Sequence, residues 1–276
     1  MDEQGQDGIN WPPVLVWSGP RGGLMHDTAL EGVMRTRTQQ VVRKCYEALP
    51  AVLVFVASLV AWELVIVGFK VKEFLVPAPS KVLIQLANPN LNWPYHFWVT
   101  AWETLAGFAV AAVFGIAIAY LIVHYRRLNQ IVYPYILLAQ IVPKVAVAPL
   151  FFIWFGFGEV PKILVAFLVA FFPIIIDTVV GLHAADPDML DFMRTLGASK
   201  YKTFMKVKLP AALPHIFGGF KVAITLAVIG AVIGEFVGAE SGLGYMIIRA
   251  QSHFRTDQVF AALFLLSVLG MALFLA

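Results

Sequence analysis

Residues 194–216 read RTLGASKYKTFMKVKLPAALPHI, and this stretch decides how the whole chain is interpreted. It concentrates five basic residues, a turn-forming Gly197 and a closing Leu-Pro pair in a chain that is otherwise strongly apolar. Apolar residues have helical spacing in DMLDFMRT, residues 188–195, and again in SKYKTFMKVKL, residues 199–209. The sequence therefore predicts two short helices that meet at a sharp turn at Gly197.

The composition is that of an integral membrane protein. The chain has 276 residues, of which 60% are apolar and 13% charged, and its mean hydropathy is +0.79. Soluble domains are about half apolar and about a quarter charged. The net charge of +3 is small, and no Lys/Arg tract alternates with aromatic residues, so we expect no nucleic-acid partner. The single cysteine, Cys45, excludes an internal disulfide and a cysteine-cluster metal site.

Six apolar runs are long enough to cross a bilayer, which takes about 20 helical residues for a core of ~30 Å. They are residues 49–69, 97–123, 131–155, 163–182, 215–238 and 258–276. Each must be a helix because the backbone finds no hydrogen-bond partner in lipid, and the continuous apolar pattern excludes a barrel. The predicted fold class is an all-α polytopic membrane protein with about six transmembrane helices.

The Lys and Arg residues favour a cytoplasmic N-terminus under the positive-inside rule. With this orientation the inside segments hold Arg21, Arg35, Arg37, Arg43, Lys44, Arg126, Arg127, Arg194, Lys200, Lys202, Lys206 and Lys208, and the outside segments hold Lys70, Lys72, Lys81, Lys162, Arg249 and Arg255. The basic segment 194–216 therefore faces the cytoplasm.

The two ends of the chain are atypical. Residues 1–45 are rich in Gly and Pro without a clear period, and we expect a flexible cytoplasmic tail, consistent with a start upstream of Met25 or Met34. The predicted transmembrane region is 46–276. The chain stops at Ala276 inside an apolar run, which predicts a truncated last helix.

The predicted cytoplasmic loop, residues 183–214, carries apolar side chains that are costly to leave in water. They are Met189, Phe192, Met193, Tyr201, Phe204 and Met205. A solvated positive-inside loop is the simpler interpretation. The Met and aromatic content favours a docking surface for a protein partner.

The loop resembles that of binding-protein-dependent ABC importer permeases, whose pattern is E-A-A, three residues, G, nine residues, I-x-L-P. The matching residues are Asp191, Phe192, Met193, Gly197, Val207, Leu209 and Pro210. The Gly, Leu and Pro are kept and Val replaces Ile, whereas Asp-Phe-Met departs from the E-A-A triplet. Residues 141–163, 209–223 and 233–247 also resemble the branch that serves nitrate, sulfonate, taurine, bicarbonate and pyrimidine-precursor importers.

This resemblance implies a type I ABC importer permease-like (MetI-like) architecture in the cell inner membrane. It also implies several partners: a cytosolic ATPase subunit that binds ATP-Mg, an extracytoplasmic substrate-binding protein and a second copy of the chain. The chain contains no G-x-x-x-x-G-K-[ST] motif, so we expect no cofactor in this chain and no ATP hydrolysis by it. An ion-gradient-driven secondary transporter is the alternative, although no internal repeat or midplane carboxylate pair supports it.

Polar residues inside the spans are candidates for the translocation path. Lys144 is predicted near the centre of the third span, next to Pro143 and one turn after Gln140. A charge at such depth costs about 3 kcal/mol or more unless it faces water or a partner. Either Lys144 contacts an anionic or polar substrate, or it pairs with Asp177 or snorkels beside a re-entrant kink, and both interpretations stay open.

A Gly-rich stretch follows the fifth span. Glu235 and Gly238 lie at the end of that span and are followed by SGLGYM, which includes Gly242. The pattern predicts a tight turn or a close helix approach that could form an outer gate. Glu103, Asp177 and Lys221 lie near span ends, where structural roles are expected. The six histidines lie in loops or at span ends with none paired at i, i+4, so we expect no metal site. A hydrolase at Ser241 is disfavoured because the G-x-S-x-G spacing is missing.

Overall fold

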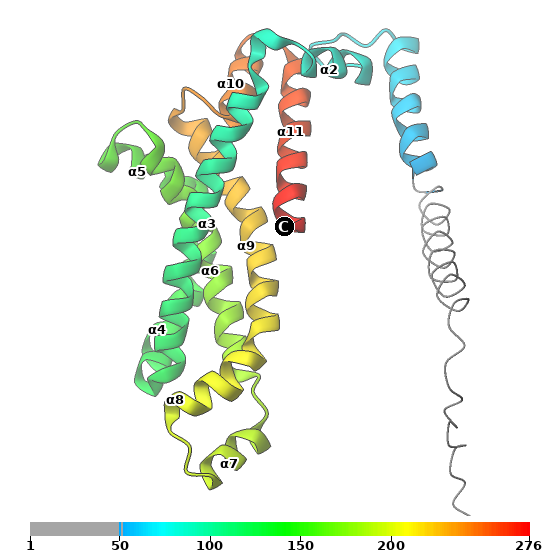
Figure 1. Ribbon diagram of the computed structural model, residues 1–276. Helices are drawn as coiled ribbons and strands as arrows, with labels where there is room; N and C mark the ends of the chain where they lie inside the picture. Colours follow the sequence, from blue (N-terminus) through cyan, green and yellow to red (C-terminus); the bar gives the residue numbers. More distant parts are fainter. Residues whose placement is uncertain (1–49, 51) are drawn as a thin grey trace, which may run out of the picture. The chain divides into compact units, whose positions relative to one another are not determined.

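The protein is all-helical in the part that the computed structural model describes, residues 50 and 52–276 (Figure 1). An apolar helix, Val52–Gly68, comes first. The later elements are α2 (Pro79–Leu86), η1 (Pro89–Leu91), α3 (Trp93–His124), α4 (Arg126–Ile141), α5 (Lys144–Phe155), α6 (Glu159–His183), α7 (Pro187–Thr195), α8 (Lys200–Thr203), the π-helical turn η2 (Phe204–Lys208), α9 (Leu209–Gly238), α10 (Leu243–Ser252) and α11 (Thr256–Leu275). The predicted fold class is confirmed, while the predicted tail, 1–45, lies outside the described residues.

Four helical runs in the described chain are long and apolar enough to cross a membrane. They are Pro89–His124, Glu159–His183, Lys200–Gly238 and Thr256–Leu275. Each contains one predicted span, so those four predictions are confirmed. The helix Val52–Gly68 is shorter than these four. The count of six and the orientation of the N-terminus remain predictions.

The third predicted span, residues 131–155, is not one straight helix, so that prediction is wrong in detail. Helices α4 and α5 are both apolar but are bent by 95° at the break between them. Pro143 follows Val142 at the break, and Val142 has extended backbone angles. The physical reason is that proline has no N–H for the helical ladder and disfavours a helical conformation in the residue before it.

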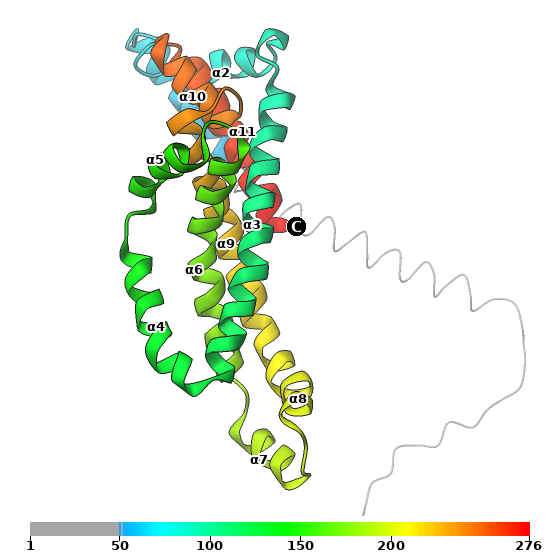
Figure 2. The same cartoon turned by 90° about the vertical axis from the view of Figure 1, so that its left-hand side faces the viewer.

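Helices α3, α6 and α9 form the centre of the bundle and run side by side (Figures 1 and 2). Their contact relies on small residues around Ala166 of α6. A Cβ atom added to Gly107 of α3 would lie 2.6 Å from the Ala166 Cβ, and one added to Gly230 of α9 would lie 2.7 Å from its Cα. Neither position has room for a side chain. Close backbone approach of this kind is how membrane helices gain packing energy without a hydrophobic driving force.

The predicted loop 183–214 ends earlier than expected. Helix α9 begins at Leu209, and α8, η2 and α9 together form a continuous helical run of 39 residues from Lys200 to Gly238. Pro210 lies in the first turn of α9, where the missing N–H of proline is tolerated. At about 1.5 Å per residue, this run is ~58 Å long. One helical rod therefore connects the α7 end of the bundle to the α10 end.

Candidate functional site

The predicted turn at Gly197 is present and has a defined geometry. Asp186 caps α7 by accepting a hydrogen bond from the backbone N–H of Asp188 at 2.9 Å. At the other end Gly197 has a φ of +65°, and the N–H of Ala198 donates to the carbonyl of Met193 at 3.0 Å. This is a Schellman motif, in which a left-handed glycine ends the helix and reverses the chain. The first predicted helix and its turn are confirmed, whereas the second predicted short helix is the start of the 39-residue run Lys200–Gly238.

One face of α7 exposes apolar side chains. The exposed fractions are 50% for Met189, 57% for Phe192 and 63% for Leu196, and their spacing of three and four residues places them on one side of the helix. We call these three residues the docking face. Asp191, beside them, accepts a 2.6 Å hydrogen bond from the Arg194 guanidinium. This exposed ion pair keeps the remainder of α7 polar.

Val207 and Leu209, in the second half of the predicted motif, are anchored in the bundle. Val207 is buried, and Leu209 packs against a core cluster of Leu182, Ala212 and Ile216. The predicted loop residues are therefore of two kinds: Phe192 and its neighbours are exposed, whereas Val207 and Leu209 fix the loop to α9. Pro210 is exposed in the first turn of α9.

The predicted path residues lie together at the break between α4 and α5. Lys144 is the first residue of α5, its ammonium group donates to the carbonyl of Gln140, and it lies 5.0 Å from the centre of the Phe172 ring. The lysine is half-buried, and no ion pair with Asp177 is present among the described residues. The broken helix thus places a cation beside a carbonyl that the break has freed from the helical ladder.

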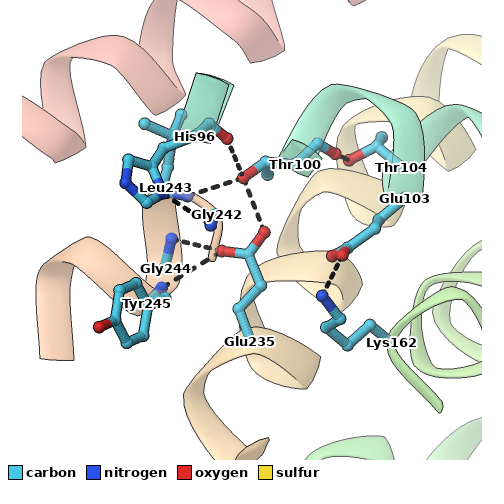
Figure 3. Close-up of polar contacts among 10 residues, drawn as sticks. All are labelled: His96, Thr100, Glu103, Thr104, Lys162, Glu235, Gly242, Leu243, Gly244 and Tyr245. Atoms are coloured by element: carbon cyan, nitrogen blue, oxygen red, sulfur yellow. Dashed lines mark hydrogen bonds and ion pairs between the residues drawn. The ribbon is translucent and has the colours of Figure 1, made fainter. Parts of the chain in front are cut away.

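At the α10 end, a buried polar cluster receives the N-terminus of α10 (Figure 3). The first four N–H groups of a helix have no partner within it. Here the N–H of Gly242 donates to His96 Nδ1 at 3.0 Å, and the N–H of Leu243 donates to Thr100 Oγ1 at 2.8 Å. The N–H groups of Gly244 and Tyr245 both donate to Glu235 Oε2. Side chains of α3 and α9 therefore satisfy the whole end of α10.

Glu235 and Gly242, two of the three predicted gate residues, meet in this cluster. The Thr100 hydroxyl donates to Glu235 Oε1 at 2.7 Å, so both oxygens of this carboxylate accept hydrogen bonds. Gly242 has a φ of +116°, and a Cβ there would lie 2.2 Å from Glu235 Oε1. Gly238 lies elsewhere, against Phe152 and Phe157. A role as an outer gate stays a prediction for these residues.

Sequence reasoning missed an ion pair next to this cluster. Lys162 of α6 pairs with Glu103 of α3, and the two residues are 4% and 0% exposed. Lys162, which is predicted to lie in an outside segment just before the fourth span, is in the first turn of α6 and is buried there. The sequence feature that indicates this pair is Glu103, a single carboxylate between Thr100 and Thr104 in an apolar helix. A carboxylate buried in such a helix needs a cation beside it.

A cavity of about 430 Å³ opens beside the pair. It lies between the α5–α6 turn and the segment that follows α9, and its polar lining comes from Glu159, Lys162, Glu240 and Ser241. Through Lys162 the cavity touches the same ion pair that joins α3 to α6. Among the described residues, no group of three His, Cys, Asp or Glu side chains is placed to hold a metal ion.

The fold and these polar sites can be compared with known proteins. Residues 111–276, more than half of the chain, match the family described as "Binding-protein-dependent transport system inner membrane component". The chain belongs to this family. It is therefore a transmembrane permease subunit of an ATP-driven ABC importer, a multi-pass protein of the cell inner membrane and a transport component rather than a catalytic one. The secondary-transporter alternative is not supported.

Individual relatives agree with this assignment. The permease is 33% identical over 238 residues to "Formylaminopyrimidine transport permease protein ThiX" of Halalkalibacterium halodurans, covering 85% of this chain and 94% of the relative. It is 34% identical over 241 residues to "Riboflavin transport system permease protein RibX" of Chloroflexus aurantiacus, covering 86% and 90%. A structure of the inward-facing MetNI methionine ABC transporter matches with a TM-score of 0.55 at 18% identity, covering 67% of this chain and 95% of that chain. The last match supports the predicted MetI-like fold.

Proposed function

We propose that the docking face of α7 inserts into a cytosolic ATPase subunit and that this contact couples ATP-Mg binding and hydrolysis in that subunit to transport. The observation that carries the proposal is the exposure of Met189, Phe192 and Leu196 together on one short helix. Burying such side chains against a partner is favourable by about 1.5–3 kcal/mol each. Insertion of α7 into lipid is a less favourable way to bury these side chains, because α7 also carries the Asp191–Arg194 ion pair and charged ends.

The 39-residue run from Lys200 to Gly238 would transmit the movement. Val207 and Leu209 fix the loop to the start of this rod, and Glu235 near its far end holds the N-terminus of α10. A displacement at α7 would reach the buried cluster at the α10 end through the turn at Gly197 and this continuous helical run. Rocking of packed helices between two arrangements is a common form of alternating access.

The transported solute is small and polar, and we propose that it enters at the cavity beside Lys162 and passes the broken helix at Gln140, Pro143 and Lys144. Half-helix ends and freed backbone carbonyls are typical of substrate sites in transporters. The relatives are named for a formylaminopyrimidine and for riboflavin, both polar solutes. The lysine at the break favours an anionic or electron-rich group. A substrate-binding protein would deliver the solute, and a second copy of the chain would complete the path.

The coupling proposal is tested by introducing a charge on the docking face. The tagged permease is purified from its native membrane, and the ATPase subunit recovered per permease is measured for Phe192→Glu. Phe254→Glu is the matched control, because Phe254 is also an exposed phenylalanine but lies between α10 and α11. We expect about a tenfold loss or more for Phe192→Glu, as follows from losing ~1.5–3 kcal/mol of burial, and none for the control. Equal recovery from both variants would contradict the proposal.

A further inference from the structure

A basic groove lies between the end of α3 and the loop that carries α7 and α8. Its volume is about 420 Å³, and its lining includes His124, Arg194, Lys200 and Lys208 together with the aromatic side chains of Tyr120 and Phe204. These four basic residues come from separate elements: the last turn of α3, α7, α8 and η2. Arg194, Lys200 and Lys208 belong to one stretch of sequence, whereas His124 is distant from them, so its place in the same cavity is a property of the fold.

The wall of the groove is built by aromatic contacts. The Tyr120 ring stacks on His124 with centroids 5.5 Å apart and meets Phe204 edge-on at 4.9 Å. Lys200, Phe204 and Lys208 follow one another at intervals of four residues, so Phe204 packs on α3 while the two lysines flank it. The π-turn η2 holds this segment, with the N–H of Leu209 bonded to the carbonyl of Phe204. Single π-turns inside helices occur often at functional sites.

The groove keeps a net positive charge. No Asp or Glu is among the residues that line it in the described chain. The nearby carboxylate of Asp191 neutralises Arg194 only, through their 2.6 Å ion pair. Lys200 and Lys208 form no ion pair with any described residue. Like charges held at one cavity repel one another, and a bound anion would relieve that repulsion.

The groove is separate from the docking face. The groove is lined on the α7 side by Leu190 and Arg194, whereas the docking face consists of Met189, Phe192 and Leu196. At about 100° per residue, the two sets lie roughly two fifths of a turn apart around the helix. An ATPase on the docking face would therefore leave the groove open.

The position of the groove indicates the source of the anion. It lies where the apolar run Pro89–His124 ends, and Tyr120 and Tyr125 mark that end as aromatic residues do at headgroup level. Basic pockets between membrane helices on the cytoplasmic side bind the head groups of anionic lipids. We propose that the basic groove binds a phosphate group, and that the anionic phospholipid of the cytoplasmic leaflet supplies it. A bound headgroup would touch α3, α7 and η2 at once and so bias the position of the coupling loop.

The test measures lipid binding to the full chain without the ATPase, so its outcome is independent of the coupling proposal. Native mass spectrometry of the purified permease follows titration with phosphatidylglycerol and with phosphatidylcholine of the same acyl chains. The variant Lys200→Gln/Lys208→Gln is compared with Lys202→Gln/Lys206→Gln, which removes the same charge from the same segment but outside the groove lining. A second variant, His124→Gln, tests the α3 wall. Thermal midpoints of all three establish that they fold.

We expect phosphatidylglycerol to bind in preference to phosphatidylcholine, with affinity about thirtyfold weaker in the groove variant, since each lysine near an anionic surface contributes roughly fivefold. The control should change little. Isothermal titration with inorganic phosphate tests whether the phosphate group comes from a soluble ligand. If the wild type binds phosphate, the groove variant does not, and neither prefers phosphatidylglycerol, the groove is a phosphate site for a free ligand rather than for a lipid. Equal losses in the two double variants, or no loss in either, overturn the proposal.

Discussion

Replacing Lys162 by Met tests the ion pair that joins α3 to α6. Lys162 is the sole charge partner that the described chain offers Glu103, and Glu103 receives no hydrogen bond from another group there. The carboxylate is fully buried, so Lys162→Met leaves a charge without compensation. Breaking a buried pair in this way costs about 3–5 kcal/mol. At roughly 2–4 °C per kcal/mol for a domain of this size, the unfolding midpoint should fall by about 6–20 °C.

The double variant Glu103→Met/Lys162→Met separates the pair from its surroundings. Replacing both partners of a buried ion pair by apolar residues is often neutral or stabilising, so we expect the midpoint to recover most of the loss. The assay is thermal unfolding of the purified permease in detergent, followed by size-exclusion chromatography for wild type, both single variants and the double variant. A midpoint for Lys162→Met within about 2 °C of wild type, less than 1 kcal/mol, would show that the ion pair does not stabilise the bundle. So would a double variant less stable than either single one.

Three further predictions use the same preparations. Thr100→Val leaves the buried N–H of Leu243 without an acceptor, which should cost about 1–3 kcal/mol and lower the unfolding midpoint; an unchanged midpoint would contradict the contact. Gly242→Ala should prevent stable folding, seen as loss of monodisperse protein, because its Cβ would overlap Glu235 at a φ of +116°. Gly197→Val should insert normally but weaken ATPase copurification, whereas Gly197→Asn should retain it. No atom lies within 4 Å of a Cβ added at Gly197, so neither variant makes a steric clash. The variants differ because Asn tolerates the left-handed backbone, whereas adopting it costs other residues about 1–2 kcal/mol.

Much of the fold follows from local patterns in the sequence. Run length and hydropathy predict α3, α6, α9 and α11 because a membrane span needs only enough consecutive apolar residues. The bend between α4 and α5 is not visible to hydropathy, since both halves are apolar. The position of Pro143 indicates where a break can occur, but packing of the two halves decides the 95° angle.

The sites divide in the same way. The α7 helix and its turn at Gly197 are predictable because the capping Asp186 and the left-handed glycine act within a few residues. The Glu103–Lys162 pair is not, because it joins α3 to α6 and a count of loop charges places Lys162 in water. Glu235 is a candidate in the sequence, yet its role as acceptor for α10 depends on a helix that the Gly-rich stretch does not predict.

We propose α7 as the contact through which an ATPase drives this permease. The most direct test is a crosslink from position 192. The chain has one cysteine, so Phe192→Cys in a Cys45→Ser background carries a single reactive thiol on the docking face. A photoactivatable maleimide on that thiol is irradiated in native membranes, and the adduct is identified by mass spectrometry. We expect an ATPase subunit in the adduct. An adduct with lipid alone, together with transport that needs only an ion gradient, would contradict the account.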